Sequence, residues 1–451
     1  IMSLHLFLLF VCCLIHCTNA IPICELFVDS SSVNTNADCG KTKIEACQGI
    51  TQAMNSANSL NTTDLTGCGS FTFHVLPGSY GNQTNNDQIN VQPDLNLQSL
   101  PILITGNTSQ TRPEFFQPWF LFADKVDTGV PITFKYLKFG PMARSKSLNA
   151  NTCLMVYAGI GGNHSLAMDI DDCEFTGCDT ALDVTQAEGS LNIQHSRFFD
   201  NGGVEQAVAG VLTAVDTLIG ASEFEKNVGQ VGAVSASYHL EVDSCVFANN
   251  FGVLGAGAIE YGAVDRAQVP TRWNQNRFEN NAGLRGGLEF HGGVNVILAN
   301  TVLSYDESMR VGPPLDGNGT TLVTADATTV QFDNTTFNYA QKTTSSSPPT
   351  INLVGYAAAS NRVVFDDGNQ FSPNNVLRCV NTSIHWKMTK PQQIHYHCST
   401  SCVSWNETCA CPSCGVLPTP APTPAPTPQP SHSPAPHSNM TWLIILCVAL
   451  A

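Results

Sequence analysis

Charged side chains are scarce in this sequence. Only 12% of its 451 residues are Asp, Glu, Lys or Arg, about half the share of roughly 25% in ordinary soluble domains. Basic residues are the scarcer kind, 20 against 36 acidic, and the formal net charge is −16. That balance argues against a nucleic-acid partner, because nucleic-acid-binding proteins gather Lys and Arg into basic patches. The surface must therefore consist mostly of uncharged polar groups.

The sequence also lacks any apolar run of about 20 residues, the length that a helix needs to cross a bilayer. A shorter run at 4–15, followed by the small residues Thr18 and Ala20, predicts a signal peptide over 1–20. A second short run ends the chain at 441–451. For it we expect either a glycolipid-anchor (GPI-anchor) signal, replaced at an upstream small residue, or a truncated membrane helix. Both ends therefore predict an extracellular protein that a membrane anchor holds at the cell surface.

Potential glycosylation sites are another sign of export. The chain has nine N-x-[ST] sequons, at Asn61, Asn82, Asn107, Asn163, Asn318, Asn334, Asn381, Asn406 and Asn439. None lies between Asn163 and Asn318, although that interval is rich in asparagine. The asparagines of this interval are therefore expected to have a structural role.

The 18 cysteines also favour an oxidising compartment. Three lie in the predicted signal peptide and one in the C-terminal segment, which leaves 18 − 4 = 14. Even sets of four and six near the two ends predict disulfides for Cys24, Cys39, Cys47, Cys68, Cys379, Cys398, Cys402, Cys409, Cys411 and Cys414. Cys411-x-x-Cys414, with His395 and His397 nearby, also has zinc-ligand spacing. In a secreted chain disulfides are the favoured interpretation, so no metal site is predicted.

A phenylalanine recurs with a period in the low twenties through the middle of the chain. The spacings are 23, 26, 23 and 31 residues, between Phe175, Phe198, Phe224, Phe247 and Phe278. Three residues after each of the last four comes an asparagine, namely Asn201, Asn227, Asn250 and Asn281. Leucine-rich repeats have a similar period, but their Leu-x-Leu framework is absent. Short alternating or β-branched stretches between Gly, Asn and Asp instead indicate short strands joined by turns.

A repeat of this length fits one coil of a parallel β-solenoid with three short strands, and such coils bury their inner faces only by stacking. The phenylalanines are then expected to form an internal ladder at about 4.8 Å spacing. The asparagines are expected at a tight turn, where Asn tolerates left-handed backbone angles and its amide bonds to the next coil. Cys173 and Cys245 would lie three coils, about 14 Å, apart. We therefore predict that they form no disulfide, which needs Cα atoms within about 7 Å.

The segments "FANNFGVLGAGAI" and "FENNAGLRGGLEF" resemble the repeats of right-handed parallel β-helix proteins of the pectin-lyase-like superfamily. They are most similar to the polymorphic outer-membrane protein repeats of bacterial adhesins, and "FTFHVLPGSYGN" resembles the first coil of the superfamily. The resemblance implies an all-β, single-stranded right-handed parallel β-helix (solenoid) with a short N-terminal capping helix and a Cys-rich C-terminal cap. Near-helical spacing of apolar residues places that helix at 43–58, with a buried face made by Ile44, Cys47, Ile50, Met54 and Ala57.

The expected organisation follows from these features. After the signal peptide we expect a β-helix at 21–395, a Cys-rich cap at 396–416, a Pro-rich stalk at 417–440 and the hydrophobic segment at 441–451. Within the β-helix, the capping region is expected at 21–70 and regular coils at about 130–305. The stalk should be an extended polyproline II helix of about 3.1 Å per residue.

Catalytic residues are less evident than the fold. By the same resemblance, hydrolases of this fold carry clustered aspartates, a G-H-G motif and an R-x-K motif, because inverting hydrolysis needs an acid and a base on opposite sides of the sugar. Here "DIDDC" supplies Asp169, Asp171 and Asp172, and "FHGG" supplies His291, but no G-H-G occurs. Alternation places Asp169 and Asp171 on one face of a strand and Asp172 on the other. These four are the candidate catalytic residues, and the favoured interpretation of each is a solvated turn residue.

The favoured function is therefore that of a non-enzymatic, glycosylated cell-surface β-helix involved in adhesion or carbohydrate binding. The alternatives are an extracellular polysaccharide lyase or glycoside hydrolase acting on acidic polysaccharide, and a passive coat or wall component. The expected partners are extracellular glycans or surface proteins and, through the C-terminal anchor, a membrane. No cofactor is predicted, and the lyase alternative leaves Ca²⁺ open.

Overall fold

A computed structural model of the chain describes helices and strands between Ile23 and Val416. The structure describes residues 23–416 except 35, 37–38, 61–67, 82–86, 91–99, 124–128, 143–151, 159–164, 204–207, 263–269, 307–320, 326–327, 341–349, 357–360, 373–375, 381, 388–394, 400–402, 406–407 and 411–414. The chain divides after Leu417 into two units. The second unit, with the predicted stalk and C-terminal segment, lies outside the described residues, as does the predicted signal peptide.

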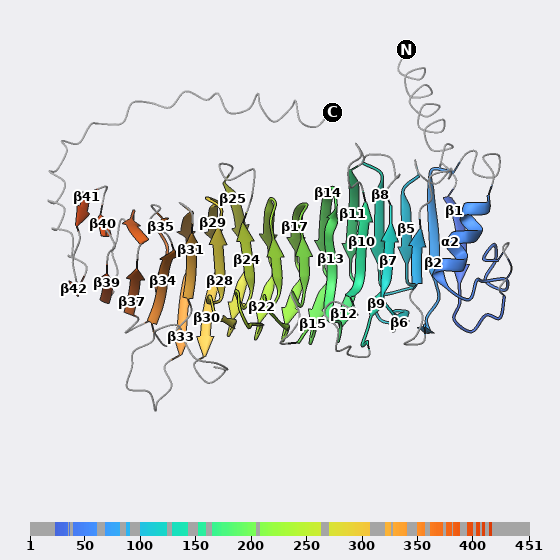
Figure 1. The fold of residues 1–451 in the computed structure, drawn as a ribbon, viewed down its shortest axis with the longest axis horizontal. Helices are drawn as coiled ribbons and strands as arrows, with labels where there is room; N and C mark the ends of the chain where they lie inside the picture. The colour runs from blue at the N-terminus through green and yellow to red at the C-terminus, as the bar shows by residue number, and fades with distance from the viewer. Residues whose placement is uncertain are drawn as a thin grey trace, which may run out of the picture. The chain divides into compact units, whose positions relative to one another are not determined.

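Three strands recur in the same order along the chain, one for each of three long sheets (Figure 1). Sheet A contains, in spatial order, β1 (Ile23–Val28), β2 (Ser70–Val75), β5 (Ile102–Thr105), β8 (Pro131–Lys135), β11 (Leu166–Asp171), β14 (Gly189–Gln194), β17 (Asp216–Gly220), β21 (Leu240–Asp243), β25 (Thr271–Asn274), β29 (Asn295–Ala299), β32 (Thr329–Asp333), β35 (Asn361–Phe365), β38 (Thr382–Trp386), β40 (Val403–Trp405) and β41 (Thr408–Ala410). Sheet B contains β3 (Ser79–Tyr80), β6 (Glu114–Phe115), β9 (Lys138–Phe139), β12 (Glu174–Thr176), β15 (Arg197–Phe199), β18 (Glu223–Glu225), β22 (Val246–Ala248), β26 (Arg277–Glu279), β30 (Val302–Asp306), β33 (Thr336–Ala340) and β36 (Gln370–Phe371).

Sheet C closes each coil. It contains β4 (Asp87–Asn90), β7 (Trp119–Phe122), β10 (Thr152–Ala158), β13 (Thr180–Ala187), β16 (Val211–Thr213), β20 (Val234–Ala236), β24 (Ile259–Gly262), β28 (Leu288–His291), β31 (Thr321–Ala325), β34 (Thr350–Tyr356), β37 (Val376–Val380), β39 (His395–Ser399) and β42 (Gly415–Val416). A short sheet D between sheets B and C contains β19 (Val228–Gly229), β23 (Phe251–Gly252) and β27 (Ala282–Gly283).

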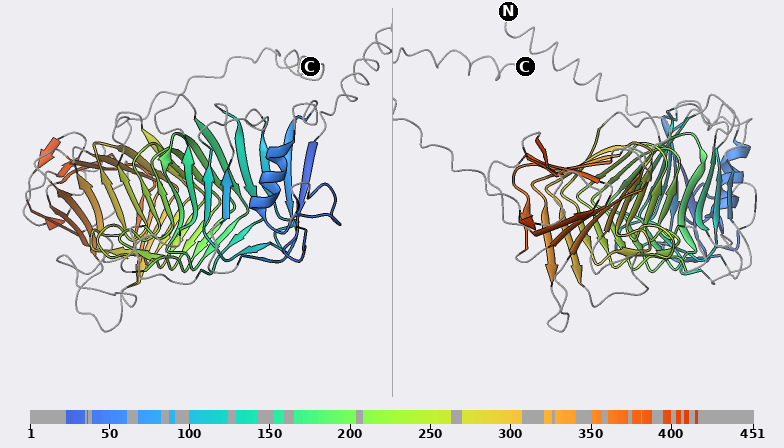
Figure 2. Two further views of the ribbon diagram at one scale, coloured as in Figure 1. Left: turned by 45° about the vertical axis from the view of Figure 1, so that its right-hand side comes forward. Right: turned by 60° about the vertical axis from the view of Figure 1, so that its left-hand side comes forward.

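Each strand pairs with the equivalent strand of the next coil, and Figure 2 shows these strands side by side along the stack. The pairing is parallel along all three long sheets up to β39 and β40, where β42 and β41 add antiparallel strands. Alternation directs apolar side chains inward, as in β11, where Met168 and Ile170 are buried and Asp169 and Asp171 face outward. The predicted parallel β-helix is confirmed.

An aromatic ladder fills the inside of sheet B. The rings of Phe175, Phe198, Phe224, Phe247 and Phe278 stack in register, with centroids 4.7 to 4.9 Å apart. Every other described strand of sheet B carries a partner in the same register, namely Tyr80, Phe115, Phe139, Leu303, Phe337 and Phe371. Burying each ring stabilises the stack by roughly 1.5–3 kcal/mol, so the ladder is a major part of the core.

A polar ladder lies beside the aromatic one and consists of buried asparagines, Asn201, Asn227, Asn250 and Asn281. The Nδ2 group of Asn227 donates to Oδ1 of Asn250 at 2.9 Å and to the carbonyl of Phe198 at 3.0 Å. Its Oδ1 accepts from the backbone N–H and the Nδ2 group of Asn201, at 3.2 and 3.0 Å. Each inner amide is thereby fully hydrogen-bonded, as a buried amide must be to avoid a large desolvation penalty.

The expectation that these asparagines adopt left-handed backbone angles is wrong by one residue. The positive φ angles belong to the residues that precede them, Asp200 (54°), Lys226 (56°), Asn249 (57°) and Asn280 (52°). Because the left-handed residue makes the corner, the residue after it points into the core and must satisfy its own amide there. Asn249 and Asn280 are therefore corner residues, equivalent to Asp200 and Lys226.

The corner between sheets A and B repeats this arrangement. A residue with positive φ, such as His195 (50°) or Ser244 (56°), is followed by a buried small or polar residue. These form a third row, Cys173, Ser196, Ser222, Cys245, Asn276, Thr301, Thr335 and Asn369. Oγ of Ser196 accepts the N–H of Cys173 at 3.1 Å, for example. Cys173 and Cys245 are both free, which confirms that they do not bond to each other.

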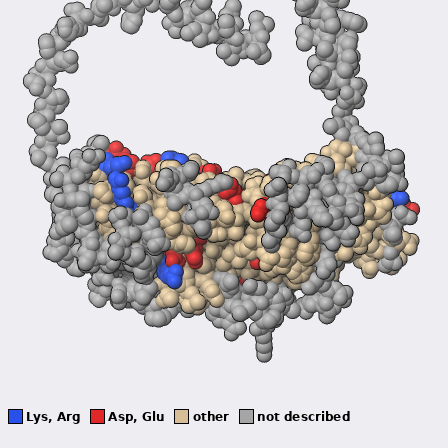
Figure 3. All heavy atoms as spheres, turned by 45° about the horizontal axis from the view of Figure 1, so that its top comes forward, with Lys and Arg blue, Asp and Glu red and all other residues tan. Residues whose placement is uncertain are grey.

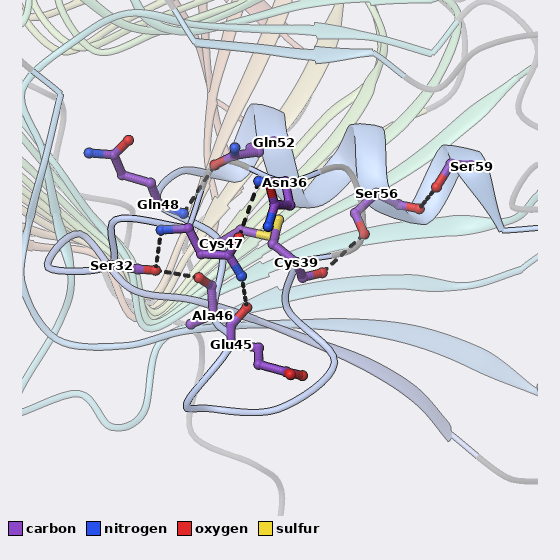
Figure 4. Close-up of a disulfide and its surroundings, with 11 residues drawn as sticks. Ser32, Asn36, Cys39, Glu45, Ala46, Cys47, Gln48, Gln52, Ser56 and Ser59 are labelled. Carbon is purple, nitrogen blue, oxygen red and sulfur yellow. Dashed lines mark hydrogen bonds between the residues drawn. A yellow bond between two sulfur atoms is a disulfide. The ribbon is translucent and has the colours of Figure 1, made fainter.

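The N-terminal end of the stack is covered by α2 (Ile50–Ser59), which starts later than the predicted 43–58 (Figure 4). Cys47 is the reason, because it is bonded to Cys39 and forms an extended bridge to Val28 of β1. Ile44, which was predicted on the buried face, is 95% exposed. From Ile50 onward the apolar face is buried as predicted.

The described residues contain three disulfides, Cys24–Cys68, Cys39–Cys47 and Cys153–Cys178. The first two pair the four N-terminal cysteines with one another. The side chains of the six C-terminal cysteines, and those of His395 and His397, lie outside the described residues. No helix in the described part of the chain is both long and apolar enough to cross a membrane.

Candidate functional site

Asp169 and Asp171 lie on the outside of sheet A, where side chains of neighbouring coils form hydrogen bonds with both. Nζ of Lys135 donates to Oδ2 of Asp171 at 2.5 Å, and Nδ1 of His195 lies 3.1 Å from Oδ1. Asp169 accepts from Nδ2 of Asn192 at 3.0 Å. Burial opposes the ionisation of Asp171, but the hydrogen bonds from Lys135 and His195 outweigh it and lower the pKa of this carboxyl. Asp171 is therefore held as an anion rather than poised to donate a proton.

Strand alternation predicted that Asp172 lies on the face opposite to Asp169 and Asp171, which is the inner face of sheet A. In the structure it does not lie there. It follows the last residue of β11 and has a positive φ of 50°. This corner turns its side chain outward, where it pairs with Arg112 of an earlier coil. Arg112 also donates to Glu174 at 3.2 Å. Asp169 and Asp171 thus tie adjacent coils together, and Asp172 pairs across two coil steps. The three aspartates therefore do not form a free acid and base that face a common space.

His291, the fourth candidate, lies on β28 of sheet C, apart from the aspartates. Its Nε2 is 3.5 Å from Oε1 of Glu260, and its ring packs over Gly262, where a Cβ atom would come within 2.0 Å of it. Glu289 on β28 is the register partner of Glu260 and accepts from Arg285 at 2.9 Å. Burial raises the pKa of the Glu289 carboxyl; Arg285 opposes this increase and the Glu260 carboxylate adds to it. The structure therefore places His291 with two glutamates that the sequence did not single out.

An aromatic cluster lies on the outer face of sheet C, nearer to its N-terminal end than His291. Phe120 and Phe122 of β7 and Tyr157 of β10 are all partly exposed. The rings of Phe122 and Tyr157 stack with centroids 5.0 Å apart and planes 8° apart, and Phe120 lies 6.4 Å from Tyr157. Burial and the nearby Asp183 carboxylate raise the pKa of Tyr157. We call Phe120, Phe122 and Tyr157 the aromatic cluster.

The aromatic cluster and the glutamates share one face. Register pairing aligns a single outward row across seven strands of sheet C, namely Phe120, Met155, Asp183, Leu212, Ser235, Glu260 and Glu289. Six steps of about 4.8 Å make this row about 29 Å long. Figure 3, which views the molecule from one side, shows a described surface that is mostly uncharged.

The sequence did contain a signal for the aromatic cluster. "WFLF" at 119–122 places large apolar side chains on both faces of one strand. A strand with one face in the core needs them on that face only. The outward pair, Phe120 and Phe122, was therefore a signal of an exposed aromatic surface. The repeat does not include this pair, because β7 precedes the regular copies.

The predicted glycosylation sites are only partly described. Asn107 and Asn334 are exposed, and the other sequons lie outside the described residues. Among the described residues no group of three or more His, Cys, Asp and Glu side chains is arranged to hold a metal. An Arg-x-Lys triplet, Arg144 to Lys146, is present in the chain and also lies outside the described residues.

Fold and site together define a parallel β-helix whose sheet C carries an outward aromatic cluster and, several coils away, a pair of neighbouring glutamates. Neither a family model nor a curated protein matches the sequence. Among solved structures the chain is similar to one described as the crystal structure of the Agl-KA catalytic domain, with 12% identity and a TM-score of 0.30. The match covers 78% of this chain and 64% of the other, so this chain spans less than two thirds of that structure. A likeness of this degree carries no argument about function.

Proposed function

We propose that this protein is a non-enzymatic, glycosylated cell-surface β-helix that binds carbohydrate along the outer face of sheet C. The observation that carries the proposal is the aromatic cluster, Phe120, Phe122 and Tyr157, partly exposed on a face that the core does not need. Aromatic rings offer a large apolar face at little cost in side-chain entropy, and the tyrosine hydroxyl adds a polar contact. Sugar rings present a matching combination of C–H faces and hydroxyl edges.

The direction of the face also suits an extended glycan. The row from Phe120 to Glu289 runs along the stack, and its repeat of about 4.8 Å is close to the length of one sugar ring in an extended chain. Between the aromatic cluster and Glu260 the row carries Asp183, Leu212 and Ser235, and the only ionisable residue of these three, Asp183, is 9% exposed. Successive sugars of one chain can therefore contact successive coils.

Membership of the pectin-lyase-like superfamily, with repeats of the polymorphic outer-membrane protein type, belongs to this proposal. It is supported by three sheets that recur in fixed order and by the internal ladders of phenylalanine and asparagine. Display at the cell surface is supported by the signal-peptide pattern, the sequons, the disulfides and the Pro-rich segment at 417–440. A glycolipid anchor or membrane helix at 441–451 completes the proposed arrangement.

Binding to immobilised polysaccharides and to a glycan array tests the proposal. Tyr157→Ala removes the central ring of the aromatic cluster and should weaken binding about tenfold, which corresponds to about 1.4 kcal/mol. Tyr238→Ala is the matched control, because Tyr238 is also exposed (37%) but lies outside the cluster. Equal effects of the two substitutions, or no binding by the intact protein, would overturn the proposal.

A polysaccharide lyase or glycoside hydrolase acting on acidic polysaccharide is the second candidate. The contact between Glu260 and His291, 3.5 Å apart and next to Glu289, favours it, because a partly exposed carboxylate and imidazole can exchange a proton with a substrate. Incubation with pectin, alginate and glycosaminoglycans, followed by measurement of released uronides, tests it. Release that Glu260→Gln abolishes would establish the enzyme, and absence of release would leave the binding protein.

A further inference from the structure

A cavity of about 540 Å³ lies at the N-terminal end of the stack, and its lining shares no residue with the aromatic cluster. One wall is the first two turns of α2 and the two residues before it, with Gln48, Gln52 and Asn55. The opposite wall is β3, the edge strand of sheet B, with Ser79. Figure 4 shows Gln48 and Gln52 together at the start of the helix. The size of the cavity is within the usual range for small-ligand sites, about 300–1,000 Å³.

The described lining is polar and uncharged. None of the described residues that line the cavity is Asp, Glu, Lys, Arg or His. Side-chain amides come from Gln48, Gln52, Asn55 and Gln117, and Gln117 is 3% exposed, so it lies at the bottom of the site. An amide both donates and accepts hydrogen bonds. An ionic ligand would lose its hydration here without gaining a counter-charge, which is costly.

Backbone groups add to this lining. The carbonyls of Gly78 and Tyr80 accept from β6, at 2.8 and 3.1 Å. Because alternate residues of a parallel strand face opposite neighbours, the N–H and C=O of Ser79 face away from β6, on the side of the cavity. On the other wall, the N-cap residue of α2 is Gly49, which has no side chain to cap the helix, and the first-turn N–H groups of a helix have no intrahelical acceptors. Backbone donors and acceptors therefore lie close to the space.

We propose that this cavity binds a neutral, hydroxyl-rich saccharide unit. The class of ligand rests on the proposed carbohydrate-binding function, but the site is separate from the aromatic cluster. The neighbouring hydroxyl groups of a sugar both donate and accept hydrogen bonds. The side-chain amides and backbone groups that line the cavity can do the same. Gln52 also accepts the backbone N–H of Gln48 at 3.2 Å. This bond fixes one wall before a ligand arrives, which lowers the entropy lost on binding.

The test is calorimetric titration of the intact protein with neutral disaccharides (maltose, cellobiose and lactose) and with glucuronate. Asn55→Trp fills the cavity, and because Asn55 is exposed on α2 the fold should tolerate the larger side chain. Ser59→Trp is the matched control, on the same helix, exposed and outside the cavity. We expect a neutral disaccharide to bind, with a loss of at least about tenfold for Asn55→Trp and none for Ser59→Trp.

Three outcomes would overturn the inference. They are no binding of any neutral disaccharide, preferential binding of glucuronate, and equal affinities for the intact protein and Asn55→Trp. Tyr157→Ala separates this site from the proposed function. If disaccharide binding survives Asn55→Trp but not Tyr157→Ala, the sugar binds at sheet C, so the cavity proposal fails and the proposed function stands.

Discussion

The asparagine ladder can be tested by removing one of its inner members, Asn250, which is 1% exposed. Its Nδ2 group donates to the carbonyl of Phe224 at 2.9 Å and to Oδ1 of Asn281 at 2.8 Å. Its Oδ1 accepts from the backbone N–H and the Nδ2 group of Asn227, at 3.0 and 2.9 Å. Asn250→Ala deletes all four bonds without disturbing the aromatic ladder directly.

The expected loss follows from the groups left without partners. The backbone N–H and one Nδ2 hydrogen of Asn227, and the carbonyl of Phe224, become unsatisfied inside the core. Oδ1 of Asn281 still accepts the backbone N–H of Asn250. A buried unsatisfied group costs about 1–3 kcal/mol. Water that enters the vacated space offsets part of this, so we expect a destabilisation of about 3–5 kcal/mol.

The neighbouring asparagine supplies the control. Asn249 has a φ of 57° and lies at the corner, so Asn249→Gly keeps the backbone conformation and should change stability by no more than about 1 kcal/mol. Guanidinium chloride unfolding, followed by circular dichroism, compares the two variants. Because coils of a solenoid can open separately, hydrogen exchange of peptides from β18, β22 and β26 should locate the loss in these coils.

A destabilisation below about 1 kcal/mol for Asn250→Ala, with unchanged exchange in these coils, would refute the reasoning. Equal effects of Asn250→Ala and Asn249→Gly would do the same, because the two asparagines would then have equivalent roles. The comparison is sharp because the residues are adjacent in sequence and chemically identical, and differ only in their position relative to the corner.

Two further predictions concern buried titratable groups. Because burial, opposed by Arg285 and reinforced by Glu260, raises the pKa of Glu289, the contribution of Glu289 to stability should be greatest below the ordinary pKa of a carboxyl and fall as pH rises towards the raised value. Glu289→Gln should flatten that fall in melting temperature, and an identical pH profile for the variant would contradict the assignment. Burial raises the pKa of Cys173 and Cys245 to about 12 each, so neither thiol should react with a maleimide at neutral pH before unfolding. Rapid labelling of either thiol in the native protein, detected by mass spectrometry, would show that its coil opens.

The repeat determined the fold from the sequence because the same physical constraint acts on every coil. Phe198 and Phe224 mark positions that must fill the interior of each coil, and Asn201 and Asn227 mark positions where a buried side chain must satisfy polar backbone groups. Residues that are not repeated carried less information about the fold. The capping helix was expected at 43–58 because periodicity alone does not reveal that a disulfide and a bridge hold Cys47 extended.

The candidate site depended on the tertiary structure even more than the fold did. The motif "DIDDC" indicated Asp171 as a candidate catalytic residue. Its hydrogen-bond partner Lys135 is 36 residues away in sequence but next to it in space. The aromatic cluster joins Phe122 and Tyr157 from different coils, and Glu260 meets His291 through the register of β24 and β28. None of these pairs has a fixed sequence spacing, because the segments between coils vary in length.

The sequence by itself therefore determined the coil, its inward phenylalanine and asparagine, and the separation of Cys173 from Cys245. Inward positions repeat since each coil must bury the same face against its neighbours. The tertiary structure alone decided which outward side chains become neighbours, and hence where the aromatic cluster, the Glu260–His291 contact and the polar cavity lie. Outward residues are free to vary from coil to coil, so only the register between strands brings them together.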